Sequence, residues 1–210
     1  MNTKKEHILL VSEKLFAEKG YDAVTTREIA RSADVNIAMI AYYFGSKEKL
    51  YEEVIAYRLF SLDSLTAELE LMSNYSSKLT LLLEVLVDKF LERKYFQQIV
   101  FRELSTDNRQ GLSQKIRLQL ISNFSYLAQT IAKGIDCKEF APVNIPLTLL
   151  SILGTLRMYI NATELLPPFG AAILASEASE DSAILLKKHL LLIIGNHLNV
   201  KLNPSFYAEN

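Results

Sequence analysis

The sequence is poor in the residues that disulfides and metal sites require. It has one cysteine, Cys137, in 210 residues, so an intramolecular disulfide and a cysteine-rich metal site are excluded. A single thiol is typical of a protein in a reducing compartment. Basic and acidic residues number 23 and 24. A globally basic nucleic-acid binder is therefore not indicated, and any binding of DNA needs charges placed locally.

Long uninterrupted hydrophobic runs are also lacking. The two most apolar stretches are Ile145–Ile160, which Arg157 interrupts, and Ala183–Gly195, which a Lys-Lys-His triplet interrupts. Neither reaches the roughly 18 to 20 clean apolar residues that a spanning helix requires. Two glutamates break the apolar part of the N-terminus, where a signal peptide would be uncharged. We therefore expect a cytoplasmic protein that makes no membrane contact.

Sequence signatures of catalysis are missing as well. There is no glycine-rich phosphate loop, no nucleophile elbow and no HExxH motif. His189 and His197 are two helical turns apart, too far to share a tetrahedral metal ion without other ligands. We expect no enzymatic activity, no catalytic residue, no metal and no cofactor.

The patterns that are present predict an all-α fold. Glycine and proline are scarce, at seven and five residues, and leucine-rich segments with helical spacing dominate over strand-like alternation. In the larger, C-terminal part of the chain we expect helices at about Ser77–Arg93, Tyr95–Ser105, Ser113–Lys133, Ile145–Leu165 and Glu180–Val200.

Capping signals divide the N-terminal part into short helices. Thr3 and Glu6 form a capping box for the first helix, and Thr25 and Glu28 form a second box for the next one. Gly20 ends the first helix in the left-handed conformation that glycine favours, so that Tyr21 packs back on Phe16. The residues expected to form the core of this part are Ile8, Leu15, Phe16, Val24, Ile29, Ala30, Val35, Ile40 and Phe44.

The stretch Val35–Gly45 has no charge at all. Asn36 is a good cap for a third helix that ends near Gly45, and Ser46 can cap a fourth helix that runs into the low seventies. Because only a few residues join the second and third helices, the arrangement predicted is a helix-turn-helix.

In a helix-turn-helix the second helix of the pair enters the major groove of DNA. Ile40 and Phe44 share one face and would anchor it in the core. The residues left for the groove are Ile37, Ala38, Ala41 and Tyr42, with Met39 and Tyr43 beside them. Small and apolar groups permit close approach and contact thymine methyls. The alternative is a packing motif of an ordinary helical protein, which the spacing alone does not separate from DNA binding.

Phosphate contacts would come from outside the reading helix. Lys47 lies in the first turn of the fourth helix, Thr26 and Arg27 begin the second helix, and Lys4 lies near the start of the chain. Such contacts hold a protein in register on the duplex, while base contacts give sequence preference.

The motifs "LFAEKGY", "TTREIA" and "YYFGSKEKL", in this order between Ile8 and Ile55, resemble the N-terminal domain of the TetR family of bacterial transcriptional regulators. The resemblance implies a homodimer of all-helical subunits that binds a double-stranded DNA operator. It implies a helix-turn-helix DNA-binding domain at residues 1–47 and an effector-binding and dimerisation domain at residues 48–210. The residues that align with the DNA-contacting positions of the family are Thr26, Arg27, Asn36, Ile37, Ala38, Met39, Tyr42, Tyr43 and Lys47.

The sequence departs from the family pattern at three places in or next to the reading helix. Asp34 replaces a frequent glycine, Ile37 replaces a frequent polar residue, and Met39-Ile40-Ala41 replaces a frequent Thr-Leu-Tyr. These departures affect the operator sequence rather than the core.

By the same resemblance, the larger domain holds a small-molecule pocket, and binding of the effector releases the operator. We expect a largely apolar effector, and the candidate lining residues are Phe90, Phe96, Phe101, Arg102, Glu103, Phe124, Tyr126, Tyr159 and Asn161. The alternative for each of them is plain core packing, and the alternative for Arg102 and Glu103 is an internal ion pair. The same fold could also serve as a DNA-binding or partner-binding protein without an effector.

The last two long helices are too apolar to be uncovered, and in the family they form a four-helix bundle across the dimer. The candidate seam residues are Leu149, Leu153, Leu156, Ile160, Leu185, Leu192 and Leu198. The alternative is that they fill the core of the single chain.

Overall fold

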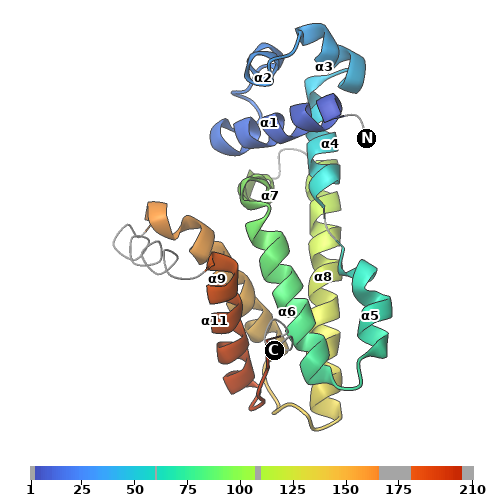
Figure 1. The fold of residues 1–210 in the computed structure, drawn as a ribbon, viewed down its shortest axis with the longest axis vertical. Coiled ribbons are helices and arrows are strands. Elements are labelled where there is room, and N and C mark those ends of the chain that lie inside the picture. Colours follow the sequence, from blue (N-terminus) through green and yellow to red (C-terminus); the bar gives the residue numbers. More distant parts are fainter. Residues whose placement is uncertain (1–2, 60, 107–109, 166–180, 205–210) are drawn as a thin grey trace. The chain divides into compact units, whose positions relative to one another are not determined.

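The computed structural model describes residues 3–59, 61–106, 110–165 and 181–204, and Figure 1 shows their course. The described residues form helices joined by short connections, with no strand among them, so the predicted all-α class is confirmed. By packing, the chain divides into two compact units. Unit 1 is Met1–Phe60 with Arg93–Gln119, and unit 2 is Ser61–Glu92 with Leu120–Asn210.

Unit 1 contains the short N-terminal helices and α7. Its elements are α1 (Thr3–Lys19), α2 (Thr26–Ser32), α3 (Ile37–Phe44), α4 (Lys47–Arg58), α7 (Lys94–Thr106) and the beginning of α8 (Gln110–Asp136). Helix α1 packs against α2, α4 and α7, so it is the central helix of this unit.

Side-chain caps start three of these helices, as the sequence predicts. Thr25 Oγ1 accepts a hydrogen bond from the Glu28 backbone N–H at 3.2 Å, ahead of α2. Asn36 Oδ1 accepts from the Ala38 N–H at 2.8 Å, and Ser46 Oγ accepts from the Lys49 N–H at 3.1 Å. Each cap satisfies a backbone donor that the first helical turn leaves without an intrahelical partner.

The ends of α1 follow the prediction only in part. Gly20 ends the helix with φ 81°, and the rings of Phe16 and Tyr21 lie 5.9 Å apart, as expected. At the other end, α1 begins at Thr3 itself, so Thr3 is the first helical residue and not the residue before the helix. The side chain of Thr3 lies outside the described residues. Glu6 Oε1 accepts a hydrogen bond from the Tyr57 hydroxyl of α4.

Most of the predicted core of unit 1 is buried. The buried members are Ile8, Phe16, Val24, Ile29, Ala30, Ile40 and Phe44. Leu15 and Val35 were predicted wrongly, because both are only half-buried. Helix α4 instead supplies Leu50, Val54 and Ile55, which are fully enclosed since α4 packs along α1.

The prediction that the fourth helix continues into the low seventies is wrong. Helix α4 ends at Arg58 because Leu59 takes an extended conformation, with φ −60° and ψ 127°. The Arg93 guanidinium donates to the Arg58 carbonyl, one of the oxygens that a helix end leaves unsatisfied. The chain then forms a 3-10 turn, η1 (Leu62–Leu65), and the short helix α5 (Thr66–Leu71).

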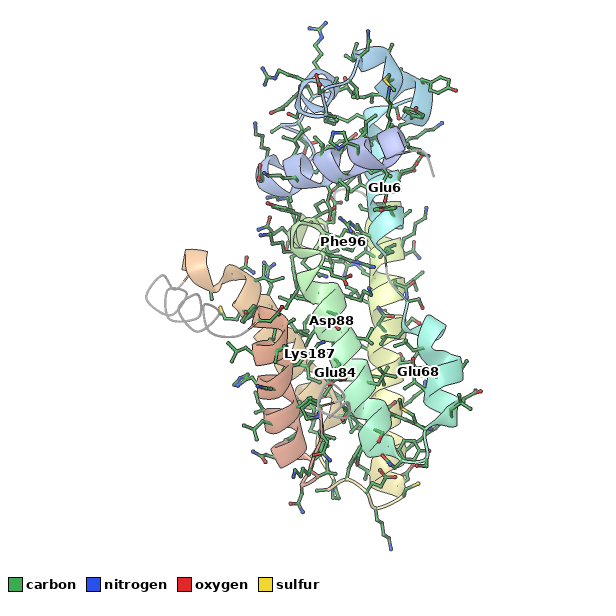
Figure 2. The ribbon with its side chains drawn as sticks, in the orientation of Figure 1. Glu6, Glu68, Glu84, Asp88, Phe96 and Lys187 are labelled. Atoms are coloured by element: carbon green, nitrogen blue, oxygen red, sulfur yellow. The ribbon has the colours of Figure 1, made fainter. Side chains whose placement is uncertain are left out.

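Unit 2 is built around α6 (Tyr75–Leu91), which packs against α11 (Ser182–His197) and α9 (Ile145–Leu165). Figure 2 shows Lys187 of α11 beside Asp88 of α6, with Nζ and Oδ1 2.8 Å apart. This ion pair joins the two helices.

Helix boundaries in unit 2 differ from the expected ones by a few residues. Asn74 Oδ1 accepts from the Ser77 N–H and starts α6 at Tyr75 rather than Ser77. Helix α8 runs from Gln110 to Asp136, beyond both expected ends. Helix α11 starts at Ser182 because Asp181 caps it, and it ends at His197 rather than Val200. Residue 180, where this helix was expected to start, lies outside the described residues.

One stretch of α9, Ile145–Ala162, is long and apolar enough to cross a membrane by length and composition, contrary to the expectation from the interrupting arginine. Only 22% of this stretch is buried within the chain. A core helix of a soluble protein that passes the same test is mostly buried, whereas most of this stretch is left uncovered by the chain itself, so it forms an uncovered apolar surface.

Candidate DNA-binding surface

A tight turn joins α2 and α3. The Val35 backbone N–H donates to the Ala30 carbonyl at 3.0 Å, which folds the chain back directly after α2. Asp34 in this turn has φ 51°, a left-handed conformation that glycine adopts freely and that aspartate and asparagine adopt more readily than most other residues. This geometry explains why glycine is frequent at the corresponding position of the family that the sequence motifs resemble.

Helix α3 has one buried face and one exposed face. Ile40 and Phe44 are buried, and Ile37 and Ala38 are exposed, as predicted. Tyr42 is 82% exposed, the largest value for any aromatic residue of the helix. Ala41 is also exposed, whereas Met39 and Tyr43 are half-buried. The exposed face of α3 is therefore uncharged, and its side chains are available to a partner molecule.

The rings of Tyr42 and Tyr43 lie 5.1 Å apart in an edge-on arrangement. Their contact holds the two phenol groups next to each other at the C-terminal end of α3. Asn36, at the other end, is exposed, although one oxygen of its side chain is used for the cap.

Basic side chains lie on the elements next to α3. Arg27 is exposed in the first turn of α2, Thr26 beside it is half-buried, and Lys4 is exposed in the first turn of α1. The Lys5 ammonium, in contrast, already has partners within the protein, because it pairs with the Glu53 carboxylate at 2.6 Å and lies 5.3 Å from the centre of the Phe44 ring.

Lys47 has partners that the sequence does not indicate. Its ammonium donates to the carbonyl oxygens of Tyr21 and Val24, each at 2.9 Å, and lies 4.1 Å from the centre of the Tyr21 ring. It therefore connects α4 to the chain segment that leads from α1 into α2. Lys47 is half-buried rather than sealed inside the molecule.

An ion pair also connects α1 to α2. Lys19 at the end of α1 pairs with the Glu28 carboxylate. The hydrogen bond from Lys19 lowers the pKa of Glu28 below its ordinary value of 4.5, and the charge of Lys19 contributes in the same direction. This pair helps fix α2 relative to α1.

The predicted pocket residues are divided between the two units. Phe96, Phe101, Arg102 and Glu103 belong to α7 in unit 1. Phe96 is buried, and Figure 2 shows it among the side chains of this unit. Phe101 is half-buried. Arg102 Nη1 donates to the Phe16 carbonyl at 2.8 Å.

Glu103 is 1% exposed, and its Oε1 accepts a hydrogen bond from the Tyr51 hydroxyl of α4 at 2.7 Å. A buried carboxylate needs such a partner, because burial without one is costly. Glu103 thus joins α7 to α4, a contact that the sequence does not reveal because Tyr51 lies 52 residues away.

The other predicted pocket residues lie in unit 2. Phe90 is buried on α6, whereas Phe124, Tyr126 and Tyr159 are half-buried on α8 and α9. The Asn161 amide donates to the carbonyl of Arg157 in the preceding turn at 2.8 Å. Arg157 itself is half-buried, and this burial lowers the pKa of its guanidinium.

A cleft of about 560 Å³ lies between the C-terminal half of α11 and the residues that follow it. Its lining includes Lys188, Leu192 and Lys201, and none of the predicted pocket residues is among its lining residues. This cleft is therefore a different feature from the predicted pocket.

Helices α9 and α11 carry an uncovered apolar face. Its exposed members are Leu147, Leu150 and Met158 of α9 and Leu192 and Ile193 of α11. We call these five residues the apolar face.

Among the predicted seam residues, Leu192 is exposed, and Leu149, Leu153, Ile160 and Leu185 are half-buried. Leu156 and Leu198 were predicted wrongly as seam residues, because both are buried within unit 2.

Comparison with known proteins supports the resemblance seen in the motifs. The family profile described as "Bacterial regulatory proteins, tetR family" matches residues 8–54. The IcaR negative transcriptional regulator of the biofilm operon icaADBC of Staphylococcus aureus is 32% identical over 134 residues, which cover 63% of this chain and 69% of that protein. The probable HTH-type transcriptional regulator YttP of Bacillus subtilis is 29% identical over 73% of this chain and 75% of its own length.

Solved structures show the same fold. A mutant of HlyIIR in which a linker replaces an internal stretch of residues is 26% identical, with a TM-score of 0.64 over 78% of this chain and 91% of that chain. The TetR-family regulator PfmR of Thermus thermophilus is 20% identical, with a TM-score of 0.67 over 89% and 92% of the two chains. The exposed uncharged helix, the tight turn before it and these similarities lead to one conclusion: the chain belongs to the TetR family of bacterial DNA-binding transcriptional regulators.

Proposed function

We propose that this protein is a ligand-responsive repressor that binds its operator as a homodimer and releases it when a small-molecule effector binds. The observation that carries the proposal is the exposed face of α3, which is uncharged, capped at its start and fixed by two buried side chains. A helix with these properties suits the major groove, where base edges and thymine methyls are read at close range. The relative IcaR is named a negative regulator, which supports repression.

The residues proposed to read bases are Ile37, Ala38 and Met39 at the start of α3. Ile37 and Ala38 are exposed, and Met39 is half-buried at the edge of the same face. None of these side chains can donate a hydrogen bond, so the specificity they supply comes from shape and from contacts with methyl groups. Tyr42 and Tyr43 carry hydroxyls that can bond to phosphate oxygens.

The charged contacts with phosphate are assigned to Arg27 and Lys4, with Thr26 and Asn36 as neutral hydrogen-bonding groups. Arg27 and Lys4 are exposed and lie in the first turns of two helices. A helix N-terminus also favours an anion through its free backbone N–H groups. These contacts supply salt-dependent affinity for any duplex.

The proposed homodimer forms through the apolar face on α9 and α11. Exposed apolar side chains on α9 and α11, which both pack on α6, are unfavourable in water, and a second copy would cover them with an identical face. A dimer also matches the pseudo-palindromic operators that helix-turn-helix proteins recognise.

The proposed effector is largely apolar and binds within unit 2. Half-buried aromatic residues of α8 and α9, namely Phe124, Tyr126 and Tyr159, support an apolar site, and Asn161 of α9 could fix one polar group. A thermal-shift screen with a panel of apolar molecules, followed by operator release, tests this part. A panel in which binders never release the operator would favour the same fold acting without an effector.

Selection of bound duplexes from a random pool, followed by footprinting, tests the function as a whole. We expect an enriched sequence with two related half-sites, spaced by about one helical turn or a multiple of it. Binding to all duplexes with equal affinity, or to none, would contradict a sequence-specific regulator.

A further inference from the structure

We infer that Lys47, Tyr21, Tyr51 and Glu103 form a continuous brace that sets the position of α2 and α3 for DNA binding. The inference rests on the proposed operator binding, and it assigns positioning roles to these four residues. All four lie in unit 1, and the contacts among them link α7 to the segment that enters α2.

At the DNA end, the brace holds the segment between α1 and α2. The Lys47 ammonium donates to the carbonyl oxygens of Tyr21 and Val24, at 2.9 Å each. Val24 immediately precedes Thr25, the residue that caps α2. An ammonium has three N–H groups, and these two bonds use two of them. Lys47 is therefore suited to fixing the start of α2 before any phosphate is present.

In the middle of the brace, aromatic rings are in contact. Lys47 lies 4.1 Å from the centre of the Tyr21 ring, and the rings of Tyr21 and Tyr51 lie 4.9 Å apart. Phe16 of α1 packs against both tyrosines, with ring centres at 5.9 and 4.8 Å. A packed aromatic cluster transmits displacement because interiors have little free space.

At the other end, the brace is attached to α7. The Tyr51 hydroxyl donates to Glu103 Oε1 at 2.7 Å, and both side chains are almost completely buried. The neighbouring Arg102 binds the Phe16 carbonyl, so α7 contacts the cluster at two adjacent points. A hydrogen bond to a buried carboxylate is stronger than a neutral one and has a defined direction.

The brace should affect operator binding, and not only the stability of unit 1. Glu103 and Tyr51 contribute nothing to the exposed face of α3, yet a movement at Glu103 would pass through Tyr51, Tyr21 and Lys47 to the start of α2. Loss of a brace contact should therefore weaken operator binding in protein that is fully folded.

The first test compares Tyr51→Phe with Glu103→Gln in the full-length protein. Tyr51→Phe removes the hydroxyl and leaves the carboxylate buried, whereas Glu103→Gln keeps an oxygen that accepts from Tyr51. Operator affinity is measured by fluorescence anisotropy on a selected duplex, at a temperature where circular dichroism shows both variants fully folded. We expect Tyr51→Phe to weaken binding about tenfold, which corresponds to one charged hydrogen bond, and Glu103→Gln, which keeps a neutral hydrogen bond, to weaken it by a smaller factor.

The second test uses Lys47→Met, with Lys49→Met as its control. Lys49 is exposed on the same helix, so both changes remove one positive charge from the same region. Loss of a lysine that only contacts phosphate would lower the magnitude of the slope of log affinity against log salt by roughly one. The brace predicts a loss of about tenfold with the salt slope of the control. It also predicts coupling between Lys47→Met and Arg27→Ala in a double-mutant cycle, because Lys47 positions the helix that carries Arg27.

The outcomes separate the two proposals. If wild type binds no selected duplex, both the proposed function and the brace are overturned. If wild type binds its operator and folded Tyr51→Phe and Lys47→Met bind equally well, only the brace is overturned. A reduced salt slope for Lys47→Met, with wild-type affinity for Tyr51→Phe, would make Lys47 a plain phosphate contact and would also refute the brace.

Discussion

Replacing Leu150 by alanine should weaken the homodimer without unfolding the subunit. Leu150 is 61% exposed in the single chain, so most of its side chain becomes buried only if a second copy covers the apolar face. Burying a whole leucine side chain contributes about 1.5 to 3 kcal/mol; scaled to the exposed 61% and reduced by the β-carbon that alanine keeps, the loss is roughly 1 to 1.5 kcal/mol per subunit. A twofold interface contains the residue twice, which gives about 2 to 3 kcal/mol per dimer. The dimer Kd should therefore rise about 30- to 150-fold.

Sedimentation equilibrium over a range of protein concentrations measures this Kd directly. Leu118→Ala is the matched control, because Leu118 is 58% exposed on α8 and does not belong to the apolar face. The control should leave the Kd unchanged, and Leu150→Ala should also lose operator affinity at low protein concentration. Equal Kd values for the two variants and wild type would refute the assignment of this face to the dimer.

Three further predictions concern single residues of unit 1. Lys19 lowers the pKa of Glu28, so the pair stabilises the fold above about pH 4.5 and less as the pH falls through the lowered pKa. Denaturant titrations of wild type and Glu28→Gln should therefore converge in acid, and a constant difference at all pH values would contradict the pairing. Glu13 is almost buried and accepts two hydrogen bonds from Arg58 at 2.7 and 2.8 Å, so Glu13→Ala should cost about 3 kcal/mol of unfolding free energy; a loss below about 0.5 kcal/mol would show that the pair is not formed. Tyr42 is 82% exposed, so Tyr42→Ala should leave thermal stability unchanged within about 0.5 kcal/mol, while gel-shift titration should show weaker operator binding.

Local signals in the sequence predicted the N-terminal helices well. Thr25, Asn36 and Ser46 cap helices because their side chains bond to backbone groups two or three residues ahead, which the sequence itself displays. The end of α4 was not predictable in this way. It depends on the Arg93 side chain, which binds the Arg58 carbonyl from 35 residues away.

The exposed face of α3 could be predicted because helical spacing places Ile40 and Phe44 together and leaves Tyr42 on another face. The partners of Lys47 could not be predicted, because they are backbone carbonyls whose position depends on how α1 and α2 are joined. The sequence shows which residues are charged or apolar, but it does not show which backbone carbonyl the ammonium of a lysine will contact.

The residues of the apolar face could not be predicted from the sequence either. Both Leu150 and Leu156 of α9 are apolar, yet Leu150 is exposed and Leu156 is buried. Because α9 is apolar on nearly every side, its periodicity does not distinguish the side that packs within unit 2 from the side that is left uncovered.

We propose that the exposed face of α3 enters the major groove of the operator. Ala38→Glu places a negative charge on that face, and Ala56→Glu places the same charge at an exposed position of α4. The decisive measurement is the operator affinity of the two folded variants at one salt concentration. We expect Ala38→Glu to abolish specific binding and Ala56→Glu to retain most of it. Equal, wild-type-like affinity in both variants would show that α3 does not enter the groove.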